Sequence, residues 1–190
     1  MTASQKISAL QLASEKYERR EYASAIELLE PLAKLGDVKA KSYLTEIYWR
    51  VEGYKDLRRA ALLQKELNDN YDSNTMAYEL GIFRETLMLL EAADDSNNSR
   101  LNDLFISLKN SRHDRNLVLA ASMTKSDRII KHNRDNSLVL YMKAFVHASR
   151  LNQKIKILGL LMFEIFTPSK NAIVIFPQQK NESHDSSPAY

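Results

Sequence analysis

The chain has 190 residues, of which 44% are hydrophobic and 27% charged, a size and composition that fit one globular domain with its own core. Its net charge of +3 is only mildly basic, whereas a dedicated nucleic-acid binder carries a dense stripe of lysine and arginine. The absence of cysteine excludes disulfide frameworks, thiolate zinc sites, iron–sulfur clusters and cysteine nucleophiles, because each requires the sulfur atom.

Helix is the expected secondary structure, because only four glycines and four prolines punctuate the chain and apolar residues recur at steps of three and four. Five helices are expected in the first half, over residues 4–18, 21–35, 37–51, 56–68 and 75–92. A polar run at 94–99 is expected to form a loop. Four more helices are expected after it, over 101–108, 116–123, 126–132 and 137–150.

Four residues mark where the first helices begin and end. Ser4 is expected to cap the first helix, and Asp37 the third, because short polar side chains accept hydrogen bonds from free N–H groups there. Gly36 is expected to end the second helix in the left-handed conformation. Pro31 stands inside that helix, so a kink or a new helix start is expected near it, unless the neighbouring helices tolerate the lost hydrogen bond.

The C-terminal part differs from the rest of the chain. Residues 155–166 are strongly apolar but shorter than the roughly 20 residues that cross a bilayer. We expect them to pack as the last core helix of a domain spanning 1–166, and the alternative is a hydrophobic end that contacts a membrane or a partner. Residues 167–177 include a β-branched run and are expected to form a short extended arm. The polar residues 178–190 are expected to be disordered.

An internal repeat is the strongest pattern in the chain. Ala25 and Ala60 stand 35 residues apart, and each follows an acidic residue by four positions. Leu44 and Leu80 stand 36 residues apart, each on a helix that begins just after a turn, and both are expected to face inward. A period of 35 to 36 residues is typical of stacked helix pairs.

Small and aromatic residues follow the same order in this region. They are Gly36, Asp37, Ala40, Leu44, Tyr48, Gly53, Asp56 and Ala60, and Met76, Leu80 and Gly81 begin another unit. The pattern, over about residues 21–81, resembles the Sel1-like branch of the tetratricopeptide-type helical repeats. This resemblance implies an all-α fold, a right-handed α-solenoid of antiparallel helix pairs. It also implies a scaffold or adaptor that binds a peptide or protein partner on a concave surface.

No catalytic, metal or cofactor site is expected, so the chain is not predicted to be an enzyme. The four histidines do not pair at the i, i+4 spacing of a helical metal site. No glycine-rich phosphate loop or nucleophile elbow occurs. Acidic residues beside loops are expected to serve as helix caps.

Aromatic residues are dense in the N-terminal half, and most are expected to pack between repeats. Trp49 follows Tyr48 and is therefore expected to point off the inner stripe, where an exposed tryptophan would anchor a partner. The residues predicted to contact a partner are Tyr22, Tyr48, Trp49, Arg50, Arg58 and Arg59.

A basic segment over residues 109–134 supports an alternative function. Its cations are Lys109, Arg112, Arg115, Lys125, Arg128, Lys131 and Arg134. No Phe, Tyr or Trp lies among them to stack on bases, so a solvated helix face is the default interpretation. The alternative is a nucleic-acid or anionic-surface binder.

The first 20 residues lack the unbroken apolar core of a secretory signal. A cytoplasmic location is therefore expected, and the alternative is a periplasmic or secreted protein whose signal peptide has been removed.

Overall fold

The computed structural model describes residues 3–124 and 134–166, and every regular element in these two ranges is helical. The elements are α1 (Ala3–Glu18), α2 (Tyr22–Lys34), α3 (Val38–Arg50), α4 (Leu57–Asn68), α5 (Met76–Ala92), the short 3-10 helix η1 (Asp95–Asn97), α6 (Asn98–Lys109), α7 (Asp114–Met123), α8 (Arg134–His147) and α9 (Leu151–Phe166). The all-α prediction is confirmed for this part of the chain. The helix expected at 126–132, the arm at 167–177 and the tail at 178–190 lie outside the described residues.

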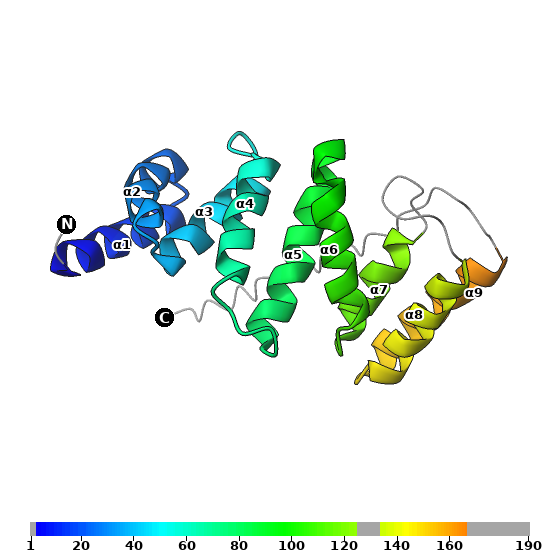
Figure 1. Ribbon diagram of the computed structural model, residues 1–190. Helices are drawn as coiled ribbons and strands as arrows, with labels where there is room; N and C mark the ends of the chain where they lie inside the picture. Colours follow the sequence, from blue (N-terminus) through cyan, green and yellow to red (C-terminus); the bar gives the residue numbers. More distant parts are fainter. Residues whose placement is uncertain (1–2, 125–133, 167–190) are drawn as a thin grey trace, which may run out of the picture.

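The helices form a row in which chain order matches spatial order (Figure 1). Within each described range, every helix packs against the next, and α8 also packs against α7. In addition, α1 contacts α3, and α5 contacts α7. Contacts between alternate helices are the arrangement of a stack of helix pairs, in which each unit touches only its neighbours.

Local capping signals explain most helix boundaries in the first half. The Asp37 carboxylate accepts a hydrogen bond from the Ala40 N–H at 2.9 Å, so this cap is confirmed. Gly36 has a φ of +83°, and the following N–H donates to the Leu32 carbonyl across the helix end. This is the predicted left-handed termination of α2.

Two local expectations, the Ser4 cap and the loop at 94–99, are wrong. Ser4 does not cap α1, because the helix already includes it and its carbonyl accepts a bond from the Ser8 hydroxyl. At Pro31, α2 does not start anew but runs through to Lys34, with buried side chains on both sides of the proline, which fits the alternative in which neighbouring helices tolerate the lost hydrogen bond. The loop expected at 94–99 is instead mostly helical, since η1 follows the Asp94 cap and leads directly into α6.

The core is built from small residues where helices meet. Ala25, Ala40 and Ala60 are fully buried, as the repeat predicts, and Leu44 fills the space between them. Leu80, expected to occupy the position equivalent to Leu44, is 48% exposed instead.

The buried face of α5 is rotated from the predicted one. It contains Gly81, Ile82 and Glu85, whereas Met76 and Leu80 lie on the surface. Apolar residues lie on every side of α5, so spacing alone does not select a face. The buried face is selected by partners on other helices, because Asn68 of α4 and Arg100 of α6 donate hydrogen bonds to Glu85.

Candidate functional site

Four tyrosines from the first two helix pairs meet at one surface, and we call them the tyrosine cluster: Tyr17, Tyr22, Tyr43 and Tyr54. The Tyr17 ring centroid lies 5.8 Å from that of Tyr22 and 5.0 Å from that of Tyr43, and the Tyr22 ring lies 6.1 Å from that of Tyr54. Such edge-to-face and tilted contacts are the favoured aromatic geometries. Tyr54 is exposed and the other three are half-buried, so the cluster is both packed and accessible.

The cluster is held by α1 and α3. Tyr17 lies in the last turn of α1. The Tyr43 hydroxyl on α3 lies 2.9 Å from the Ser14 hydroxyl on α1. The pKa of Tyr17 is raised, mainly because burial disfavours the phenolate and secondly because the Glu46 carboxylate is nearby. The Tyr17 ring therefore stays a neutral surface.

Two arginines border the cluster on the α3 side. Tyr43, Glu46 and Arg50 share one face of α3 because they are spaced three and four residues apart. Glu46 pairs with Arg50 at 3.1 Å and also with Arg84 from α5. Two guanidinium groups around one carboxylate leave one net positive charge among these three side chains.

Trp49 is not the exposed anchor that its sequence position predicts. It is only 6% exposed, and its indole N–H points to Glu91 of α5 at 3.4 Å. The guanidinium carbons of Arg50 and Arg84 lie 4.6 Å and 5.8 Å from its ring centroid. Spacing along α3 defines a single buried stripe, whereas residues of α5 cover Trp49 on another side of the helix.

Tyr48 and Arg59 form a separate group around Glu30 of α2. Tyr48 is buried, and its hydroxyl donates to the Glu30 carboxylate at 2.9 Å. The Arg59 guanidinium pairs with the same carboxylate and lies 4.7 Å from the Tyr48 ring centroid. Burial, and secondly the bond to Glu30, raises the pKa of Tyr48 to about 12.

Arg58 is the most accessible of the six predicted contact residues. Its side chain is 76% exposed and pairs with Asp94 at the end of α5. Nearby, Lys55 pairs with Glu91 at 2.5 Å. The structure thus brings Tyr22 and Arg50 to the tyrosine cluster, unites Tyr48 with Arg59, and places Arg58 apart from both.

The basic segment is described only in part. Lys109, Arg112 and Arg115 are exposed at the junction of α6 and α7. Lys125, Arg128, Lys131 and the Arg134 side chain lie outside the described residues. The Lys109 ammonium lies 5.8 Å from the ring centroid of Phe105, an aromatic residue just outside the segment.

A buried polar chain crosses three helices, and the sequence interpretation missed it. Gln64 donates to Asn68 at 2.9 Å on α4, and Asn68 donates to Glu85 of α5 at 2.8 Å. Arg100 of α6 completes the chain with two hydrogen bonds to Glu85, at 2.7 Å and 2.9 Å. Gly81 makes room for it, because a Cβ at that position would overlap the Asn68 amide. The helical glycine was the one sequence signal that could have pointed to it.

Neither a metal-binding group nor a membrane span is found among residues 3–124 and 134–166. No three His, Asp or Glu side chains gather there as a metal ion would need. No helix in the same ranges combines the length and the apolarity that a bilayer crossing requires.

Comparison with known proteins returned no match, whether against protein-family models, curated protein sequences or solved structures.

Proposed function

We propose that the protein is a scaffold that binds a peptide or protein partner on the tyrosine cluster and its bordering arginines, and that it binds without catalysing a reaction. The observation that carries the proposal is the cluster itself, in which four rings from three helices and a turn pack together and remain accessible. Tyrosine and arginine are enriched among the residues that dominate binding energy at protein interfaces.

The support beneath the cluster favours binding, since a rigid surface loses little conformational entropy when a partner docks. Glu46 fixes both arginines, and Trp49 lies buried under their guanidinium groups. The resemblance of residues 21–81 to Sel1-like repeats agrees with this role. Compared with the residues proposed from sequence, Tyr48 and Trp49 become supporting residues, and Tyr54 joins Tyr22 and Arg50 as a contact residue.

A selection from a displayed random-peptide library against the full chain would test the proposal. The enriched peptides would be synthesised, and their affinity measured by calorimetry. We expect Tyr54→Ala to weaken binding about tenfold or more, the loss of roughly 1.4 kcal/mol that a contact aromatic can account for. Arg50→Ala should weaken binding as well.

Leu62→Ala provides the matched control, because Leu62 is an exposed apolar residue of α4 outside the cluster. It should bind the peptides as the intact chain does. Peptides that bind equally well to Tyr54→Ala and Arg50→Ala would contradict the proposal. If a single-stranded RNA oligonucleotide bound instead, with affinity falling steeply with salt and lost in Lys109→Ala/Arg112→Ala, the basic segment would be the functional surface.

A further inference from the structure

The last two described helices expose a continuous set of large apolar side chains, which we call the apolar seam. It consists of Val139, Met142 and Val146 on α8 and Leu151, Ile155, Leu158 and Met162 on α9. Their exposed fractions run from 46% to 75%, at the end of the row of helices (Figure 1). Contiguous apolar surface of this kind marks interaction sites on soluble proteins.

Spacing shows that the seam suits a helical partner. Its members on α9 follow one another at intervals of four, three and four residues, and those on α8 at three and four. Alternating steps of three and four place side chains in the line that a packed helix contacts, as in coiled coils. Ile157, a buried residue of α9, lies about 100° around the helix from Leu158, so the seam is not the side that Ile157 turns to the core.

The two helices present their stripes on the same side. The Lys154 ammonium of α9 lies 5.5 Å from the ring centroid of Phe145 of α8, which marks where the helices meet. Met142 is the neighbour of Phe145 one turn earlier, and Leu151 and Leu158 are the neighbours of Lys154 at i−3 and i+4. The contact between Phe145 and Lys154 therefore joins the stripes into one surface.

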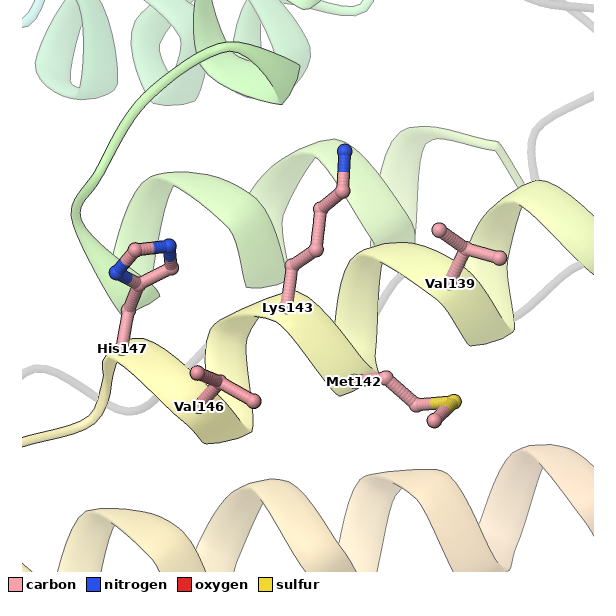
Figure 2. A pocket seen from close by; sticks show the side chains of 5 residues that line it. All are labelled: Val139, Met142, Lys143, Val146 and His147. Carbon is pink, nitrogen blue, oxygen red and sulfur yellow. The ribbon is translucent and has the colours of Figure 1, made fainter.

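A hollow on α8 adds shape to this surface. Its volume is about 320 Å³, and its lining consists of Val139, Met142, Lys143, Val146 and His147. In Figure 2 all five side chains project from α8, with Lys143 and His147 pointing the same way. This shallow, mostly apolar depression can contact an apolar side chain of a partner, and the Lys143 ammonium at its border can pair with a carboxylate.

Charge distinguishes between the possible occupants. Residues 137–162 contain the cations Lys143, Arg150, Lys154 and Lys156 and no aspartate or glutamate. A second copy of the chain would bring the same cations against these, and like charges in an interface are costly. The chain's own apolar run at 172–176 carries no charge and would leave them unpaired. An acidic helix complements both the seam and its charge.

We propose that the apolar seam docks an acidic amphipathic helix of a partner protein. Its apolar residues would lie along the seam, and its carboxylates would pair with Lys143 and Lys154. Seven partly exposed side chains offer on the order of 500 Å² of apolar surface. With the partner's share this is a small interface, of the size that transient complexes bury. The inference does not depend on the tyrosine cluster, which lies on other helices.

The test uses two synthetic helical peptides of three heptads, labelled with fluorescein. Both carry Leu and Ile at positions a and d, and one carries Glu and the other Lys at positions e and g. Fluorescence anisotropy with the full chain should show the acidic peptide binding at least tenfold more tightly than the basic one. The variant Val146→Asp/Ile155→Asp should abolish this binding, because it places charge on the seam.

A charge reversal keeps the test independent of folding. Lys143→Glu/Lys154→Glu should bind the basic peptide in preference to the acidic one. The matched control is Lys109→Glu/Arg112→Glu, which makes the same charge change at the junction of α6 and α7. Lys109 also lies over a phenylalanine ring, as Lys154 does. This control should still bind the acidic peptide in preference to the basic one.

Four outcomes would overturn the proposal. Equal binding of both peptides would show that charge plays no part. A dimer of the intact chain in light scattering, lost in Val146→Asp/Ile155→Asp, would assign the seam to a second copy. Binding by a chain ending at residue 166 but not by the full chain would assign the seam to the C-terminal residues. Seam-dependent sedimentation with phosphatidylserine vesicles, without peptide binding, would assign it to a membrane surface.

Discussion

Gly81 has no side chain, and the Asn68 side chain of α4 occupies the space where one would stand. A Cβ there would overlap the Asn68 amide oxygen and lie 2.9 Å from its Cγ, inside a packed interior. We predict that Gly81→Ala lowers the free energy of unfolding by about 2 kcal/mol, because the Asn68 amide must move and lose its bond to Glu85. Urea denaturation followed by circular dichroism would measure this change.

Gly159 provides a control of opposite sign, because it also lies within a helix but nothing stands within 4 Å of a Cβ added there. Gly159→Ala should leave the protein as stable or stabilise it by up to about 1 kcal/mol, the gain in helix propensity. If both substitutions changed stability by the same amount, the packing of Asn68 against Gly81 would have no energetic consequence.

Tyr48 should make stability depend on alkaline pH. Its pKa is about 12 in the folded protein against 10.0 for an unperturbed tyrosine, so above pH 10 the unfolded state loses the proton first. The free energy of unfolding should therefore be unaffected by this group below pH 10 and fall as the pH rises from 10 to 12. Tyr48→Phe removes this part of the dependence.

The comparison between intact protein and Tyr48→Phe would be made by urea denaturation at several pH values between 8 and 12. Near pH 8 the variant should be less stable by about 1 kcal/mol, since the hydrogen bond to Glu30 is lost. The difference should shrink as the pH rises. Tyr54→Phe, on the exposed turn, should show the same dependence of stability on pH as the intact protein. If Tyr48→Phe also showed that dependence, Tyr48 would not be the group that causes it.

At the scale of single helices, capping residues decide where α3 begins. We predict that Asp37→Ala lowers the free energy of unfolding by about 1 kcal/mol, because the Ala40 N–H loses its acceptor. Asp37→Asn keeps an acceptor oxygen and should change stability little. Thermal unfolding of both variants would measure the difference, and equal losses would show that the cap contributes through charge rather than through the hydrogen bond.

Helix boundaries were predictable because such signals are local. Asp37 and Gly36 act on residues within one turn, so the neighbouring sequence is enough to predict these helix boundaries. The buried face of α5 was not predictable in this way, since apolar residues lie on every side of the helix. Glu85 is directed inward by Asn68 and Arg100, which come from different helices, and no periodicity within α5 reports them.

Contacts between helices also limited how much of the candidate site could be predicted from sequence. Tyr22 and Arg50 were predicted as contact residues, and both lie at the tyrosine cluster. The contact between Tyr17 and Tyr43 depends on how α1 lies beside α3, which spacing along one helix does not reveal. Trp49 was misplaced for a related reason, because α5 covers the side of α3 that a single stripe leaves open.

In the whole molecule, α5 connects the two halves of the row. It reaches α4 and α6 through the buried polar chain. The Glu79 carboxylate accepts hydrogen bonds from Ser111, in the turn before α7, at 2.6 Å and from Asn116 on α7. Stacks of this kind transmit stability only through neighbouring interfaces. A weakened interface at α5 should therefore uncouple the helices before it from those after it.

Arg100→Ala tests this coupling. Glu85 is 1% exposed, and its buried carboxylate would lose the guanidinium that pairs with it, so we predict a loss of about 3 kcal/mol in the free energy of unfolding. The urea transition should also broaden, with a smaller dependence on denaturant, because the two parts of the row then unfold separately. Hydrogen exchange followed by mass spectrometry should show α6 and α7 opening before α3 and α4.

Glu85→Gln/Arg100→Met separates the role of charge from that of packing. Glutamine still accepts the bond from Asn68, and methionine fills the space of the arginine stem without a charge that needs a partner. Removing both charges of a buried pair is far less costly than removing one. The double variant should therefore recover most of the lost stability and a single sharp transition. If it unfolds as early as Arg100→Ala, the arginine stem rather than the ion pair couples α5 to α6.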